Sequence, residues 1–250
     1  MTATNDIDAN FAACSRLAEK AAAAGCQLLA LPECFAFIGE KDTDGVAIAE
    51  ALDGPLLERY RSLARAHSLW LSLGGFQEAP LPAPEAAAEQ PRTHRYNTHV
   101  LLDADGTTAG AYRKIHLFDI DVPGRVTLKE SNATLPGSTL CVAPSPLGAL
   151  GLTVCYDLRF PELFQARNKR ATAASTPSRL SPGKRCGAVS LKHRNAPPPA
   201  QALRFAAGAE VMLIPAAFTV PTGQAHWEVG DSLWAYCRSS CCSSRPAAAG

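Results

Sequence analysis

Three short segments of this chain each place a chemically active side chain at or just after the end of an expected strand. In chain order they are the apolar run QLLALPECF with Glu33, the segment AYRKIHLFDIDVPG with Lys114, and the apolar run LGALGLTV followed by Cys155. Lys114 follows a predicted hairpin whose turn is marked by Asp105 and Gly106. Runs of this length and composition predict buried strands, and helical stretches separate them, so we expect an α/β fold. A carboxylate, an amine and a thiol at strand ends are the groups that thiol attack on an amide carbonyl requires.

The segment GLTVCYDLRFPEL is the most specific of the three. Residues 147–154 predict a short buried strand, and Pro161 with Glu162 predicts the first turn of a helix. Cys155 would then face a helix N-terminus, whose amides and dipole favour the thiolate. A lone cysteine on an apolar strand is otherwise most often a buried structural thiol. The two other segments, with Glu33 and Lys114, favour the interpretation of Cys155 as a nucleophile.

The pattern suggests a role for each side chain. Glu33 would take the proton of the Cys155 thiol and later pass it to the leaving amine. Lys114 and the backbone N–H of Tyr156 would stabilise the oxyanion of the tetrahedral intermediate. Taken singly, Glu33 would be interpreted as a surface carboxylate and Lys114 as a solvated charge. Their joint placement at strand ends supports catalysis.

LPECF, YRKIHLFDIDVPG and VCYDLRFPEL together resemble the nitrilase superfamily of carbon–nitrogen hydrolases. The resemblance is to the branch that contains omega-amidase and the deaminated-glutathione amidases, in which the order Glu33, Lys114, Cys155 is the family order. It implies a four-layer αββα sandwich and a fourth catalytic residue at Glu130, which would orient the lysine. From the residues alone, Glu130 is equally well an exposed loop acid.

The resemblance also indicates a substrate class. CYD after the strand is similar to the amidase branches rather than to true nitrilases, which implies hydrolysis of a small carboxylate-bearing amide, such as an α-keto acid amide, through a cysteine thioester. Arg159 is a candidate for the substrate carboxylate, with bracing of Glu162 as the alternative. Phe218 is a candidate for the pocket wall. Two alternative functions are an N-carbamoyl amine amidohydrolase and a non-catalytic interaction module.

Composition limits the other classes of function. The 250 residues are 47% hydrophobic, which is enough to bury a substantial core. The nine cysteines lack CxxC or His-rich spacing, so we expect reduced thiols and no metal site. No glycine-rich nucleotide loop is present, and the chemistry needs no cofactor. The start MTATNDIDANF lacks a basic, apolar leader, so we expect a cytoplasmic protein without a membrane span.

The rest of the chain alternates helix-like and strand-like segments. Apolar residues recur at helical spacing between Phe11 and Ala21, and Gly25 would end that helix. Further on we expect a helix at Leu57–His67, a strand at Leu69–Phe76 and a surface loop at Pro80–Pro91. The expected partners are a small-molecule amide and, from the resemblance, further copies of the chain. We do not expect nucleic acid.

Residues 166–201 depart from this pattern, because they contain eight Lys or Arg and no Asp or Glu. Gln165-Ala166 recurs as Gln201-Ala202, and deletion of the segment restores a continuous helix and strand. We therefore expect a domain over residues 1–229 that this basic insert interrupts. The insert is either a disordered basic loop with a role such as nucleic-acid contact or a translated intron. The absence of interleaved aromatic residues favours the intron.

Residues 230–250 mix Ser, Cys, Arg and Ala without a helical or strand period, and predict an irregular tail. The strand that precedes the first helix in the family is also missing. The expected sandwich is therefore incomplete at both termini. Unpaired strand edges are costly, so one hypothesis is that the chain folds poorly or is inactive.

Overall fold

The computed structural model describes residues 1–41, 43–80, 93–122, 126–160, 163–164, 189–190 and 209–218. Within these ranges, no helix has the length and apolar character that a bilayer crossing requires. The predicted tail, residues 81–91 of the predicted loop and all of the predicted insert except Val189–Ser190 lie outside the described residues.

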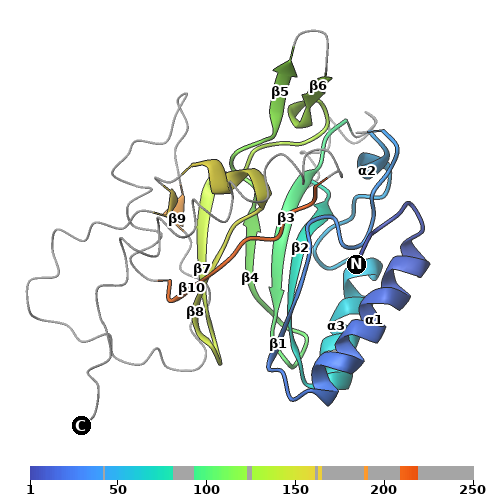
Figure 1. The fold of residues 1–250 in the computed structure, drawn as a ribbon, viewed down its shortest axis with the longest axis vertical. Coiled ribbons are helices and arrows are strands. Elements are labelled where there is room, and N and C mark those ends of the chain that lie inside the picture. The colour runs from blue at the N-terminus through green and yellow to red at the C-terminus, as the bar shows by residue number, and fades with distance from the viewer. Residues whose placement is uncertain are drawn as a thin grey trace, which may run out of the picture.

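The first sheet carries most of the predicted strands (Figure 1). In spatial order its strands are β1 (Leu28–Leu31), β2 (Trp70–Glu78), β3 (Tyr96–Leu102) and β4 (Thr108–Arg113). β1 runs parallel to β2, whereas β2, β3 and β4 are antiparallel. The predicted hairpin is therefore confirmed, and its turn contains Gly106 at a φ of 74°.

Two long helices cover the outer face of this sheet: α1 (Ile7–Ala23) and α3 (Pro55–His67) (Figure 1). The Asp6 carboxylate caps α1 by accepting a hydrogen bond from the Ala9 N–H at 2.9 Å, and Pro55 starts α3. The short α2 (Asp44–Ala47) lies between them in sequence. Apolar faces of α1 and α3 pack on the sheet in one core, whose largest buried side chains are Phe35, Tyr60, Leu71, Leu73 and Phe76.

The second sheet has the spatial order β10, β8, β7, β9. Its strands are β7 (Thr139–Ser145), β8 (Gly148–Leu152), β9 (Val189–Ser190) and β10 (Val211–Leu213). β9 is the described part of the predicted insert, and it pairs antiparallel with the start of β7.

The two sheets pack face to face through a second core. Leu101 and Tyr112 of the first sheet meet Cys141, Leu150 and Leu152 of the second, and all five are fully or almost fully buried. The described residues therefore form a helix layer and two sheets, which confirms the expected α/β class with paired sheets.

A separate hairpin extends from one end of the sandwich (Figure 1). It consists of β5 (Asp119–Val122) and β6 (Val126–Lys129), and a short 3-10 helix, Glu130–Asn132, follows it. This hairpin carries the chain from Lys114 to Glu130.

Two glycines let neighbouring segments lie against β2. Gly75 has a φ of 72° at a shift in the β2–β3 register, and a Cβ there would lie 2.7 Å from the backbone N of Cys34. A Cβ on Gly74 would collide with Pro215. The loop after β1 and the segment after β10 can therefore both approach the sheet at this point.

Candidate active site

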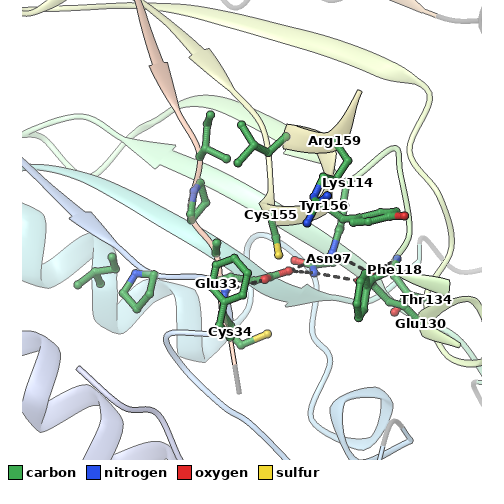
Figure 2. A pocket seen from close by; sticks show the side chains of 18 of the residues that line it. Glu33, Cys34, Asn97, Lys114, Phe118, Glu130, Thr134, Cys155, Tyr156 and Arg159 are labelled. Atoms are coloured by element: carbon green, nitrogen blue, oxygen red, sulfur yellow. Dashed lines mark hydrogen bonds and ion pairs between the residues drawn. The ribbon is translucent and has the colours of Figure 1, made fainter. Parts of the chain in front are cut away.

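A cavity of about 970 Å³ opens where β1, β4, β8 and β10 end. It collects all seven candidate residues from the sequence (Figure 2). They are Glu33, Lys114, Glu130, Cys155, Tyr156, Arg159 and Phe218.

Glu33 follows β1 and is only 6% exposed. Its Oε1 accepts a hydrogen bond from Asn97 Nδ2 at 2.9 Å, and its Oε2 accepts one from the Ala217 N–H at 3.0 Å. The neighbouring Cys34 has a φ of 55°, which turns the chain away from the strand direction. Glu33 is therefore a buried carboxylate that hydrogen bonds fix in place. It is not the surface acid that the sequence alone also allowed.

Lys114 lies between two carboxylates. Its Nζ is 3.2 Å from Glu33 Oε1 and 2.8 Å from Glu130 Oε2, and its side chain is 2% exposed. Burial by itself lowers the pKa of this amine, but the charges of Glu33 and Glu130 outweigh burial and raise it above the usual value. Lys114 is therefore a buried cation at neutral pH.

Glu130 begins the 3-10 helix after β6, and its side chain is 15% exposed. Besides the contact with Lys114, its Oε2 accepts a hydrogen bond from the Phe118 N–H at 2.8 Å. Asn97 Nδ2 also donates to its Oε1 at 3.2 Å, so one amide contacts both Glu33 and Glu130. Glu130 is therefore not the exposed loop acid that the sequence alone also allowed.

Cys155 is the first residue of a 3-10 helix, Cys155–Arg159, just after β8, and has a φ of 45°. Its N–H donates to the Pro215 carbonyl at 2.8 Å. In Figure 2 its sulfur points toward the Glu33 carboxylate, with Lys114 nearby. A positive φ on a residue other than glycine is strained, and the contact with the chain after β10 stabilises it.

The expected preference for a thiolate at Cys155 is wrong. Burial, and then the negative charge of Glu33, raise the pKa of this thiol well above its ordinary value, although Lys114 opposes them. The first turn of the expected helix, Pro161 with Glu162, lies outside the described residues, so burial and the Glu33 charge set the direction of the shift. At rest the sulfur is a thiol, hydrogen-bonded to Glu33.

The second thiol in the cavity, Cys34, is in a similar state. Burial and the adjacent Glu33 charge raise its pKa to about 12. The Cys34 sulfur accepts a hydrogen bond from Gln77 Nε2 at 3.8 Å, whereas the Cys155 sulfur is hydrogen-bonded to Glu33, so of the two thiols Cys155 is the one placed to lose its proton to Glu33.

Asp157 fixes the nucleophile's helix to the first sheet. The carboxylate is fully buried, and it accepts hydrogen bonds from Tyr112 Oη at 2.8 Å, the Val154 N–H at 3.0 Å and the His116 N–H at 3.1 Å. His116 Nδ1 lies 2.7 Å from the same carboxylate, and its ring stacks on Phe160. This network joins residues next to Lys114 with residues next to Cys155.

The three predicted substrate-contact residues all line the cavity. Tyr156 packs edge-on against Phe118 and Phe160, at centroid distances of 5.0 and 5.6 Å, and forms an aromatic wall. Arg159 is exposed at the rim, and Phe218 is 41% exposed. The structure thus places these side chains beside Cys155.

Sequence reasoning missed several polar residues of this cavity, including Asn97, Arg95 and Thr134. Asn97 had a detectable signal, because a polar residue at the start of the apolar run YNTHVLL needs a buried partner. Arg95 has no comparable signal, since an arginine just outside a strand is most often solvated.

A thiol, a carboxylate within its reach and a buried ammonium ion meet around one cavity, which is an arrangement suited to acyl transfer. In the described ranges, no group of three or more His, Cys, Asp or Glu side chains is placed to hold a metal ion.

Comparison with known proteins agrees with this geometry. Residues 1–184 match the family model described as carbon–nitrogen hydrolase. The chain is 37% identical over 230 residues to the nitrilase and fragile histidine triad fusion protein NitFhit of Caenorhabditis elegans, an alignment that covers 91% of this chain and 42% of that protein. It is 38% identical over 231 residues to human deaminated glutathione amidase, covering 92% and 57%.

Solved structures give the same result for the fold. The C. elegans NitFhit crystal structure superposes with a TM-score of 0.64 at 35% identity, covering 92% of this chain and 45% of that one. Saccharomyces cerevisiae Nit3, described as a member of the nitrilase superfamily, has a TM-score of 0.60 at 23% identity, covering 91% and 65%. The chain spans about half the length of the two curated relatives named above.

Proposed function

This chain belongs to the carbon–nitrogen hydrolase family, and from that premise we propose that it hydrolyses the C–N bond of a small amide that carries a carboxylate. The observation that carries the proposal is the placement of Lys114 Nζ at 3.2 Å from Glu33 and 2.8 Å from Glu130, in the cavity that also holds Cys155.

The reaction begins with the thiol. Glu33 accepts the Cys155 proton as the sulfur attacks the amide carbon, and the carbonyl oxygen becomes an oxyanion. Lys114 stabilises that charge. The Cys155 N–H is already bonded to Pro215, so the Tyr156 N–H is the next amide available as a second donor.

The second half of the reaction releases the products. Glu33 returns the proton to the nitrogen, the C–N bond breaks, and ammonia or an amine leaves a thioester on Cys155. Glu33 then takes a proton from water, and the hydroxide adds to the thioester carbonyl. The C–S bond breaks, the acid leaves, and Glu33 passes its proton to the sulfur to restore the thiol. Glu130 keeps Lys114 charged throughout and acts as a positioning residue.

The names of the relatives support the substrate class. Human deaminated glutathione amidase is named for a glutathione derivative, and glutathione carries carboxylates at both ends. Deaminated glutathione and α-keto acid amides are therefore the first compounds to test. The cytoplasmic location and the homo-oligomeric state remain predictions, which cell fractionation and light scattering would check.

The test measures released ammonia or amine, and the matching acid, from the 250-residue chain and its Cys155→Ala variant. We expect the variant to lose about 10³-fold or more of the rate. Cys26→Ala removes an exposed thiol and serves as the matched control, with an unchanged rate. A Cys155→Ala variant as active as the parent chain would exclude the mechanism.

A further inference from the structure

We propose that Arg95 and Thr134 form a subsite that binds a carboxylate of the substrate away from the reacting carbonyl. The proposal rests on the amide hydrolysis proposed above, and adds which side chains select a carboxylate-bearing amide. Both residues line the same cavity as Cys155.

Backbone pairing sets the two side chains next to each other. Arg95 and Thr134 form an isolated parallel bridge. The Arg95 N–H donates to the Ala133 carbonyl at 3.0 Å, and the Leu135 N–H donates to the Arg95 carbonyl at 2.8 Å. Residues paired in register across a bridge project to the same side, so guanidinium and hydroxyl share one face.

Three side-chain polar atoms of this pair have no hydrogen-bond partner among the residues that the structure describes. Arg95 Nε and Nη1 and Thr134 Oγ1 are buried and make no hydrogen bond, and no ion pair between described residues includes Arg95. Buried polar atoms without partners are rare because they are costly. A ligand that accepts these hydrogen bonds would remove that cost.

The guanidinium is also held in place before any ligand binds. Arg95 packs against α2, where a Cβ on Gly45 would lie 2.5 Å from its Nε, so a larger residue would displace it. Thr134 is 2% exposed. A fixed guanidinium presents parallel N–H donors that match the two oxygens of a carboxylate, and the hydroxyl can donate a third hydrogen bond.

The buried cation of the cavity, Lys114, is already engaged. It contacts Glu33 and Glu130, which leaves it little net charge to offer a remote substrate group. Arg159, the sequence candidate for this role, is exposed at the rim, where water screens its charge. Arg95 is partly buried, and its buried Nε and Nη1 donors have no partner among the described residues, so it fits the role better.

The experiment compares glutaramate, which has a carboxylate, with glutaramide, which has the same carbon chain and none. In Arg95→Gln we expect kcat/KM for glutaramate to fall about 10- to 100-fold, mainly through KM, with glutaramide nearly unaffected. Lys129→Gln removes an exposed cation that also lines the cavity, and is the charge-matched control. We expect less than about a 3-fold change there.

Several outcomes would overturn the subsite. They are an equal loss for both amides, no loss for either, or a selective loss that follows Lys129→Gln or Arg159→Gln instead. If Arg95→Gln fails to fold, Arg95→Lys and Thr134→Val replace it. In each of them we expect kcat/KM to fall for glutaramate and not for glutaramide, by a smaller factor than in Arg95→Gln. Unchanged selectivity in both would contradict the proposal.

A binding measurement separates this inference from the reaction itself. Glutarate titrated calorimetrically into the 250-residue chain needs no catalysis, and we expect at least 10-fold weaker binding by Arg95→Gln than by Lys129→Gln. If the chain hydrolyses neither amide but shows this difference, the proposed function fails and the subsite stands. If glutarate does not bind, or binds equally to both variants, the subsite fails.

Discussion

At the scale of single residues, the chemistry of the cavity depends on which groups hold protons. The pKa values of Cys155 and Lys114 both lie above their ordinary values, for different reasons. Burial and the Glu33 charge disfavour the Cys155 thiolate, whereas the two carboxylates favour the Lys114 ammonium ion. At neutral pH the resting site is thus a thiol and a cation, and Glu33 must remove the proton during attack.

Replacement of Glu33 tests this assignment. In Glu33→Gln the proton acceptor is lost, and we expect kcat to fall about 10²- to 10⁴-fold. The same change removes a negative charge that raises the Cys155 pKa, so the thiol should ionise at lower pH. The pH profile of Cys155 alkylation by iodoacetamide, read by mass spectrometry, should therefore shift toward lower pH.

Glu58→Gln is the matched control for that experiment, because Glu58 is an exposed carboxylate in the first turn of α3 and does not line the cavity. It should change neither kcat nor the alkylation profile. An alkylation profile of Glu33→Gln that stays in place or moves to higher pH would show that Glu33 does not raise the thiol pKa.

At the scale of elements, the position of the nucleophile depends on a five-residue 3-10 helix, Cys155–Arg159, which needs support from the surrounding structure. Asp157 provides the support, by accepting hydrogen bonds from Tyr112, Val154 and His116. The helix that carries Cys155 is therefore tied to β4 and to the loop after Lys114.

Two variants measure how much the hydrogen bonds of Asp157 stabilise the fold. Tyr112→Phe removes one donor to Asp157 and should lower the free energy of unfolding by about 1 kcal/mol. Asp157→Ala leaves several buried donors unpaired and should lower it by about 3 kcal/mol or more. Urea unfolding of both variants measures the difference, and equal losses would mean that the carboxylate is not the centre of the network.

The elements that could be predicted are those whose apolar period repeats over many residues. The helix at Leu57–His67 and the strand at Leu69–Phe76 appear as α3 and β2, with ends shifted by two residues or fewer. The 3-10 geometry at Cys155 could not be predicted, since it depends on the distant Pro215 carbonyl and on Asp157. The expectation of a thiolate is wrong for another reason, because it left out the burial of Cys155 and the adjacent Glu33 charge.

At the scale of the whole molecule, the two sheets contribute different parts of the site. Glu33, Asn97 and Lys114 come from the first sheet, and Cys155 comes from the second. The sequence could predict that the three strand ends carry these groups. It could not predict the Arg95–Thr134 pairing, because a single bridge between two loops leaves no periodic pattern.

The packing between the sheets should therefore limit stability. Leu152 is fully buried in the core between them, and Leu152→Ala should lower the free energy of unfolding by about 2–5 kcal/mol. Leu147→Ala, at a position that is 46% exposed, should change it by about 0.5 kcal/mol or less. Thermal unfolding followed by circular dichroism measures both, and similar losses would contradict the role of this core.

The Ala217 N–H holds the Glu33 carboxylate, and the Pro215 carbonyl holds the Cys155 N–H. These contacts join residues as many as 184 positions apart. A growing polypeptide on the ribosome that has not yet reached Ala217 lacks both restraints, although its thiol and carboxylate are already made. Assembly of the reactive centre is thus tied to the synthesis of residues 215–217.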